Sequence, residues 1–218
     1  MGVVKRAVIC GGAPVSMADL PAELPPYALC VCADAGLRAA QQLGIPPDFV
    51  VGDFDSLGSV PAEGNVVTYP AEKDDTDLML AVKYAIAHGF KTICIFGCMG
   101  GRVDMSIATM QTLCYIINNG CTGYVFGENS VMTGIRNTRT FLGPGRKGIV
   151  SVFAYGGDAK GVTISGLKYN MENGTIFCDM PRGVSNEFVG TPASIEVTSG
   201  TLIIVTTNNG FRKETLGR

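Results

Sequence analysis

The chain has 218 residues, of which 46% are hydrophobic and 17% charged, and its formal net charge is −2. A chain of this length forms one large domain or two small ones and buries roughly 70% of its unfolded surface. The small net charge gives no long-range field that would attract nucleic acid or an anionic membrane, so a polyanionic ligand would have to be held locally.

The first ~125 residues alternate short β-rich runs with helical patterns, which predicts a parallel sheet flanked by helices, a Rossmann-like α/β domain. The strand candidates are apolar on both alternations, as expected where both faces are covered. They are 7–10, 29–32, 49–51, 92–96 and 124–126. One helix is predicted from Leu78 through Ile86 with Gly89 as its stop, and another from about Asp104 to Ile117, ending near 119–120.

From about Val131 onward the helical period disappears, and short runs alternate with turn signals. Asn173-Gly174 and Ser199-Gly200 are each predicted to join two strands as a hairpin. We therefore expect a smaller all-β domain, a sandwich or a barrel. The polar stretch 127–130 is the predicted boundary, which gives an α/β domain over 1–128 and a β domain over 129–218.

Cys10, Cys30, Cys32 and Cys94 lie in apolar, strand-like runs, where free thiols pack as small hydrophobes. A zinc site that combines Cys30 and Cys32 with Cys94 and Cys98 is a weaker alternative, because neither pair has the usual two-residue spacing. No run approaches the ~18 apolar residues of a membrane span, and the apolar stretch near the N-terminus is too short for a signal peptide. A reducing cytoplasm is the expected location.

Six of the eleven aspartates fall between positions 53 and 104, in three clusters: Gly-Asp-Phe-Asp-Ser at 52–56, Lys-Asp-Asp-Thr-Asp at 73–77 and Gly-Gly-Arg-Val-Asp at 100–104. Carboxylates repel one another, so this concentration costs free energy unless a cation offsets it. The clusters are predicted at the carboxyl ends of strands, where ligands bind in open α/β sheets. Mg²⁺ carrying a polyphosphate is the leading interpretation.

The first two clusters each have a simpler alternative. Asp53 and Asp55 can project from one face of an extended segment and share a divalent cation, but they also suit an Asx-rich turn. Asp74 and Asp77 loosely fit a capping box at a helix start, where the dipole alone favours carboxylates. Three aspartates in four residues exceed what a cap requires, and Lys73 beside them can offset charge or contact a phosphate.

The segment 97–104 follows a predicted strand and opens a predicted helix, the setting in which backbone N–H groups bind phosphate. It fits neither the P-loop nor the dinucleotide-binding pattern, and such a segment is often only a tight turn. Arg102 and Asp104 add a bidentate phosphate donor and a third acidic site. Asp34 follows the second strand, where local evidence favours an N-cap over a nucleotide contact. His88, the single histidine, is expected to close a helix rather than to act in catalysis.

Taken in order, the three clusters followed by Gly-Val-Ser-Asn-Glu-Phe at 183–188 resemble the thiamine pyrophosphokinase family. The similarity covers nearly the whole chain, including 161–169. It implies a homodimer whose α/β domain binds ATP and Mg²⁺ and whose β domain completes the thiamine site across the subunit interface. It also implies that the thiamine hydroxyl attacks the β-phosphorus of ATP, releasing AMP and forming thiamine diphosphate.

The resemblance assigns roles by motif. It places Asp77, Asp55 and Arg102 in catalysis, with Asp77 orienting or deprotonating the thiamine hydroxyl. The implied metal ligands are Asp53, Asp55, Asp77 and Asp104. The implied ATP-binding residues are Asp34, Lys73, Asp74, Thr76, Gly100, Gly101, Arg102 and Asp104. Ser185 and Asn186 would face thiamine together with Asp77, although a β-turn explains that pair locally.

The sequence departs from the family at Met105, where many members carry a polar residue, and Met cannot donate a hydrogen bond. It also has no Trp, so stacking on thiamine would need Phe188, Tyr169 or another aromatic residue. Two rival functions remain: a Mg²⁺-dependent nucleotide phosphohydrolase that uses water in place of thiamine, and a non-enzymatic nucleotide or thiamine sensor.

Overall fold

The computed structural model describes residues 5–15, 26–52, 65–68, 74–127 and 129–207. The chain forms two compact units, and their described parts run from 5 to 127 and from 129 to 207. Each unit is described separately below.

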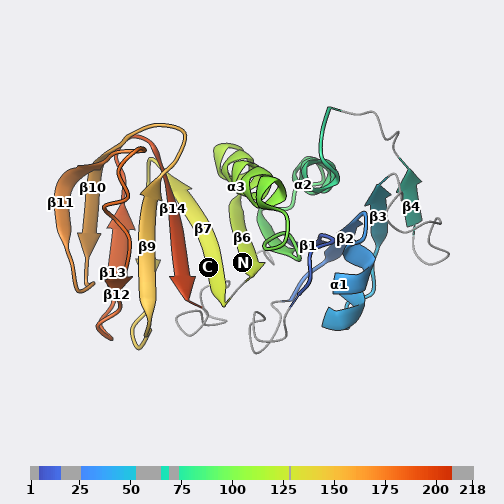
Figure 1. Cartoon of the computed structure of the whole chain (residues 1–218), viewed down its shortest axis with the longest axis horizontal. Helices are drawn as coiled ribbons and strands as arrows, with labels where there is room; N and C mark the ends of the chain where they lie inside the picture. The colour runs from blue at the N-terminus through green and yellow to red at the C-terminus, as the bar shows by residue number, and fades with distance from the viewer. Residues whose placement is uncertain (1–4, 16–25, 53–64, 69–73, 128, 208–218) are drawn as a thin grey trace. The chain divides into compact units, whose positions relative to one another are not determined.

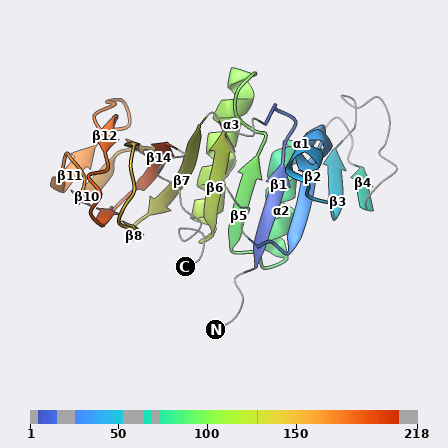
Figure 2. The ribbon, with the colours of Figure 1, turned by 90° about the horizontal axis from the view of Figure 1, so that it is seen from below.

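The first unit is built on a parallel sheet with the strand order β6-β5-β1-β2-β3-β4 (Figures 1 and 2). All of its described strand pairs are parallel. The strands are β1 (Arg6–Cys10), β2 (Leu29–Ala33), β3 (Phe49–Gly52), β4 (Asn65–Thr68), β5 (Thr92–Phe96) and β6 (Thr122–Gly127). The chain moves outward from β1 through β4 and then returns to β5 on the other side of β1. The order of the sheet therefore reverses between β1 and β5.

The helices α1 (Gly36–Leu43), α2 (Asp77–Ala87) and α3 (Val103–Asn118) cover this sheet. Crossovers between parallel strands are right-handed, so reversing the direction of strand addition moves later helices to the opposite face. Figure 1 shows α1 on one face and α2 with α3 on the other. In agreement, α1 contacts β1 and β2, whereas α2 contacts α3 as well as the sheet.

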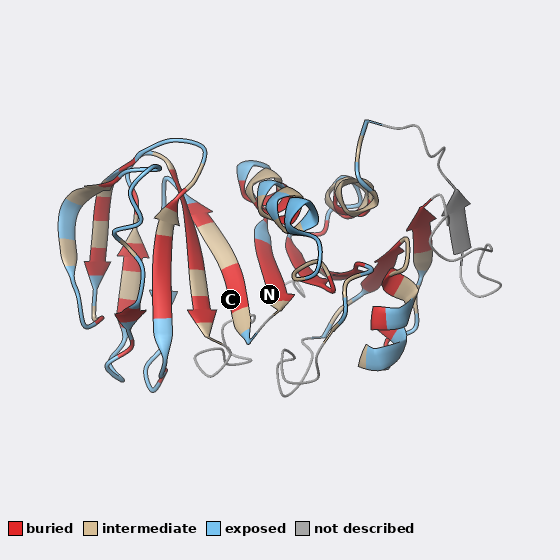
Figure 3. Cartoon of the chain, in the orientation of Figure 1, coloured by how far each residue is buried: buried red, intermediate tan, exposed pale blue. Residues whose placement is uncertain are grey.

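The strands of this sheet are buried on both alternations, as the sequence predicts. Every residue of β2 and β5 is buried, and so are the last four residues of β1 (Figure 3). The predicted helix stops are also confirmed, because Gly89 and Gly120 follow α2 and α3 with positive φ angles of 81° and 68°. The strand β4 was not predicted from the sequence, and the short α1 was predicted only through Asp34 as its cap.

In the second unit, the strands β12-β9-β14-β7 pair antiparallel in that order, and a four-stranded antiparallel sheet has the order β11-β10-β13-β8. Their strands are β7 (Ser130–Arg136), β8 (Arg139–Leu142), β9 (Ile149–Ala154), β10 (Ala159–Ser165), β11 (Met171–Ile176), β12 (Asn186–Glu187), β13 (Ala193–Glu196) and β14 (Thr201–Thr207). Side chains from both sheets share one apolar core that includes Ile164, Ile195, Leu202 and Ile204. This unit is therefore a β sandwich, one of the two expected architectures.

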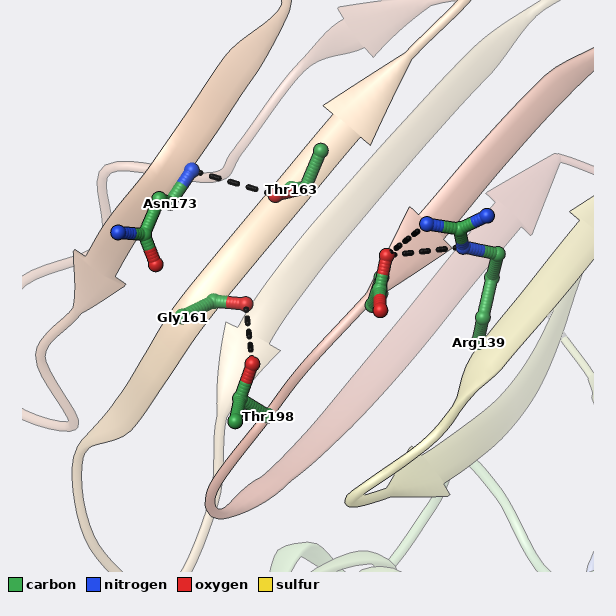
Figure 4. A network of polar contacts seen from close by, with 6 residues as sticks. Arg139, Gly161, Thr163, Asn173 and Thr198 are labelled. Atoms are coloured by element: carbon green, nitrogen blue, oxygen red, sulfur yellow. Dashed lines mark hydrogen bonds and ion pairs between the residues drawn. The ribbon is translucent and has the colours of Figure 1, made fainter.

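Neither predicted hairpin turn joins a hairpin. Asn173 and Gly174 lie inside β11, where the pairing with β10 shifts register. Asn173 has a positive φ of 46° and its N–H donates to Thr163 Oγ1 at 3.2 Å (Figure 4), so the pair bends a continuous strand. Ser199-Gly200 connects β13 to β14, which belong to different sheets. Local turn chemistry marks a change of direction but does not select the partner strand.

On the sheet that contains β13, the guanidinium of Arg139 binds the carboxylate of Glu196, with its Nε at 2.8 Å (Figure 4). The two residues face each other in the register between β8 and β13. This cross-strand ion pair helps to fix β8 at the edge of its sheet.

Within the described residues, no helix is long and apolar enough to cross a membrane.

The start of α1 gives a test of the packing at the end of β1. A Gly→Ala change inside a helix normally stabilises it by up to ~1 kcal/mol. A Cβ on Gly36, however, would lie 1.9 Å from the carbonyl oxygen of Cys10. We expect Gly36→Ala to lower the free energy of unfolding by about 1–3 kcal/mol, measured by urea denaturation.

Gly143→Ala is the matched control, because a Cβ there would meet nothing within 4 Å. Its free energy of unfolding should stay close to that of the wild type. Equal stability of the two variants would contradict the close approach of α1 to β1.

Candidate active site

The candidate site lies at the carboxyl edge of the parallel sheet, where the described parts of the loops after β1, β2 and β5 begin. The loops after β1 and β5 flank the point at which the strand order reverses, which is where ligands bind in open α/β sheets. These two loops are joined by backbone hydrogen bonds, from the N–H of Gly11 to the carbonyl of Phe96 and from that of Ala13 to the carbonyl of Gly97, both at 2.8 Å.

Glycine is required where these loops meet. A Cβ on Gly97 would lie 2.4 Å from the carbonyl oxygen of Gly11, and one on Gly11 would lie 2.2 Å from the sulfur of Cys98. Gly97 also has a positive φ of 64°. The two backbones are therefore in direct contact, and this contact fixes the beginning of the glycine-rich turn.

The end of β2 brings Asp34 beside the end of β3. The N–H of Asp34 donates to the carbonyl of Val51 at 2.7 Å, and a Cβ on Gly52 would lie 3.1 Å from the Cα of Asp34. The prediction that Asp34 caps the next helix is wrong, because the N-cap of α1 is Ala35, with no side-chain cap bond. Asp34 instead adopts a positive φ of 49°, which places a half-buried carboxylate at the carboxyl edge.

The segment 74–77 leads into α2, and its aspartates differ in their surroundings. The predicted capping box of Asp74 with Asp77 is wrong, because the N-cap is Thr76, whose Oγ1 accepts the N–H of Met79 at 3.2 Å. Asp75 accepts a hydrogen bond from the ammonium of Lys83 at 2.6 Å, and this bond raises the pKa of Lys83.

Within the same segment Asp74 is exposed, whereas Asp77 is half-buried in the first turn of α2. Asp77 is thus the carboxylate that the helix itself carries at this edge. The amino end of α2 lies at the carboxyl edge of the sheet because, in a parallel α/β unit, each helix begins on the side where the preceding strand ends.

The glycine-rich turn ends at α3 with Gly100 and Gly101, which have positive φ angles of 81° and 72°. Arg102 is the N-cap of α3, without a side-chain cap bond. Its Nη2 and Nε donate to the two carboxylate oxygens of Asp104 at 2.6 and 3.2 Å. This fork lowers the pKa of Asp104, and both side chains are exposed. A phosphate that bound Arg102 would therefore compete with Asp104.

Three predicted site residues, Asp53, Asp55 and Lys73, lie outside the described residues. Within the described parts of the chain, no three His, Cys, Asp or Glu side chains are grouped closely enough to hold a metal ion.

His88 lies away from this site, at the amino edge of the sheet. It is the C-cap of α2 and stacks on Tyr84 with ring centroids 4.0 Å apart.

All eight cysteines are free thiols. Burial raises the pKa of Cys94 and of Cys98 to about 12, so both remain protonated at neutral pH. Protonated buried thiols behave as the small hydrophobes that the sequence predicts.

In the second unit, Asn186 begins the short strand β12, and Ser185 directly precedes it. Ser185 is exposed with a positive φ of 59°, and its N–H donates to Ser151 Oγ at 3.1 Å. Asn186 is buried, and its side-chain amide bonds both backbone groups of Tyr169, accepting at 3.0 Å and donating at 2.7 Å. Asn186 thus ties two segments together, while the Ser185 hydroxyl lies on an exposed residue.

Sequence reasoning missed two residues that organise the carboxyl edge. Lys83 carries the ion pair with Asp75 across eight positions of sequence. Thr109 reaches from α3 to the glycine-rich turn, with its Oγ1 3.0 Å from the carbonyl oxygen of Cys98. A buried threonine in an apolar helix stripe is the only local signal that could have found Thr109.

A parallel α/β unit with a glycine-rich turn at its carboxyl edge, followed by a β-sandwich unit, defines a two-unit α/β protein. Residues 23–125 match the family described as thiamin pyrophosphokinase, catalytic domain, and residues 143–202 match thiamin pyrophosphokinase, vitamin B1 binding domain. The chain belongs to the thiamin pyrophosphokinase family, which confirms the resemblance seen in the sequence.

Individual relatives of known sequence or structure support the same family assignment. The chain is 26% identical over 205 residues to the thiamine pyrophosphokinase of Bacillus subtilis (strain 168), covering 91% of this chain and 96% of the relative. A crystal structure of thiamine pyrophosphokinase from Bacillus subtilis aligns with a TM-score of 0.82, covering 93% of this chain and 99% of that one. The yeast thiamin pyrophosphokinase structure is only 13% identical but has the same fold, with a TM-score of 0.73 over 99% of this chain and 89% of that one.

The cap at Thr76 can be tested separately from any contact with a nucleotide. We expect Thr76→Ala to lower the free energy of unfolding by about 1 kcal/mol in urea without ligand, because Met79 loses its hydrogen-bond acceptor. Thr76→Ser keeps the oxygen and should retain most of the stability. If Thr76→Ala were as stable as Thr76→Ser, the cap would contribute nothing.

Proposed function

We propose that this chain transfers the pyrophosphoryl group of ATP to the hydroxyl of thiamine, giving thiamine diphosphate and AMP. The observation that carries the proposal is the match of both units, in order, to the catalytic and vitamin B1 binding domains of one enzyme family. The carboxyl edge of the first unit supplies the chemistry that such a transfer needs, since phosphoryl transfer depends mainly on positioning and on neutralising charge.

The glycine-rich turn is the proposed binding site for the polyphosphate. Gly100 and Gly101 bear no side chains that would keep a phosphate away from the backbone, and α3 begins directly after them. Arg102 is exposed and offers a planar, bidentate donor once it leaves Asp104. The remaining residues proposed to contact ATP are Asp34, Lys73, Asp74, Thr76 and Asp104.

Mg²⁺ is part of the proposal, and Asp53, Asp55, Asp77 and Asp104 would hold it. The donors are all carboxylates, which suit a hard divalent cation. Asp77 fits this role because it is half-buried at the amino end of α2, whereas Asp104 is exposed and shares its carboxylate with Arg102. When bound, the cation supplies neutralisation of the phosphate charge.

Asp77 is the proposed group that orients the thiamine hydroxyl and accepts its proton. The hydroxyl oxygen forms a bond to the β-phosphorus, the bond between the β-phosphorus and the oxygen that bridges it to the α-phosphate breaks, and AMP leaves with that bridging oxygen. The side chain of Asp77 is carried by a helix whose first turn is capped by Thr76, which limits how far the carboxylate can move. Asp55 and Arg102 complete the proposed catalytic set.

The second unit is the proposed thiamine-binding unit, with Ser185 facing the substrate and Asn186, predicted beside it, supporting the site through its bonds to Tyr169. Asn186 holds the backbone of Tyr169, an exposed aromatic side chain that could stack on a thiamine ring in a chain without Trp. The proposal includes a homodimer that completes the thiamine site, supported by large exposed apolar side chains on this unit such as Phe141 and Val189. Free thiols support a cytoplasmic location.

Product analysis separates this function from its rivals. With ATP, Mg²⁺ and thiamine, we expect AMP and thiamine diphosphate in equal amounts, and no AMP when thiamine is left out. ADP as the nucleotide product would refute pyrophosphoryl transfer. Nucleotide release without thiamine would identify a phosphohydrolase, and binding without any turnover would identify a sensor.

Asp77→Asn tests the proposed base. The amide cannot accept the proton, so we expect turnover to fall by at least ~10²-fold, while the free energy of unfolding falls by no more than the ~0.3–1 kcal/mol of a first-turn carboxylate. Steady-state kinetics and urea denaturation measure the two effects. Near-wild-type turnover would remove Asp77 from the mechanism.

A further inference from the structure

Thr109 lies in the second turn of α3 and is almost fully buried, with 2% of its surface exposed. Its hydroxyl lies within hydrogen-bond distance of two carbonyl oxygens, that of Met105 at 2.8 Å and that of Cys98 at 3.0 Å. The single hydroxyl proton is therefore shared between the helix and the turn that precedes it.

The contact with Met105 is the usual one, because a threonine in a helix donates to the carbonyl four residues earlier. The contact with Cys98 leaves the helix and reaches back eleven residues to the end of β5. Thr112 shows what the helix alone provides. It is equally buried at 1% exposure, and its Oγ1 donates to the carbonyl of Ala108 at 2.9 Å, inside the helix.

Cys98 is also held from the opposite side. A Cβ on Gly11 would lie 2.2 Å from its sulfur, so the loop after β1 packs directly against it. Beyond Cys98 the turn runs through Gly100 and Gly101, both in the positive φ region. Glycines have no side chains with which to anchor the turn, so its conformation depends on contacts made before them, of which that at Cys98 is one.

We propose that Thr109 is a positioning residue that fixes the glycine-rich turn in the conformation that binds the polyphosphate of ATP. The inference rests on the proposed function for the identity of the ligand. Thr109 touches no substrate and acts through the carbonyl of Cys98, which holds the start of the turn against α3. Loss of the hydroxyl leaves that carbonyl without its donor and lets the turn populate other conformations. The apparent affinity for the polyphosphate then falls in proportion to the fraction of molecules whose turn keeps the binding conformation.

The test compares Thr109→Val with Thr112→Val, two isosteric changes in neighbouring turns of one helix. We expect Thr109→Val to weaken MgATP binding roughly 2- to 10-fold by isothermal titration calorimetry, the equivalent of one hydrogen bond. Thr112→Val should leave MgATP binding unchanged. Thr109→Ser keeps the hydroxyl and should restore the wild-type affinity. In steady state the KM for ATP should rise in Thr109→Val while the KM for thiamine stays the same.

Hydrogen exchange of the ligand-free full-length protein gives a second readout that needs no activity. Peptides covering 97–101 should exchange faster in Thr109→Val than in Thr112→Val. Equal affinity and equal exchange in the two variants would overturn the proposal. A wild-type protein that binds MgATP but forms no thiamine diphosphate would refute the proposed function and leave this comparison valid.

Discussion

Direct contact between backbones at the carboxyl edge of the parallel sheet is the constraint on which the site depends. Gly11, Gly36 and Gly97 each occupy a position where a Cβ would lie within 2.4 Å of another atom. Without side chains between them, the loops after β1 and β5 bond to each other, and α1 begins directly against β1. Hydrogen bonds and van der Waals contacts at this range tolerate little displacement, so the groups carried on these loops are held in fixed relation.

This rigid edge carries side chains whose charges are already partly balanced. Asp75 is bonded to Lys83 and Asp104 to Arg102, all of them at or near the surface. Exposed pairs of this kind contribute little to stability, because water screens them and the side chains lose entropy. They do offset part of the negative charge at 74–77 and at 104. Binding of a polyphosphate would then exchange one set of ionic contacts for another, rather than create charge pairs where none existed.

The two units bury their strands in different ways, and this difference suits different tasks. The parallel strands of the first unit are covered on both faces, which leaves the edge of the sheet as the place for polar groups. The strands β10 and β13 of the second unit alternate buried and more open positions, and exposed positions of this unit carry large apolar side chains such as Phe141. An edge site suits a polyanion, whereas open faces suit an organic ring or a second protein surface.

The sequence alone determined the features that depend on local chemistry. Apolar runs located the buried strands, glycines with positive φ located the helix ends, and four short motifs in order identified the family. Tertiary structure decided which partner each group has. Asp34 is not the helix cap that its position predicts, Asn173-Gly174 bends β11 instead of joining two strands, and the Thr109 hydroxyl contacts the carbonyl of Cys98. Turn and cap preferences are worth about 1 kcal/mol, so long-range packing selects among them, and no local pattern records that choice.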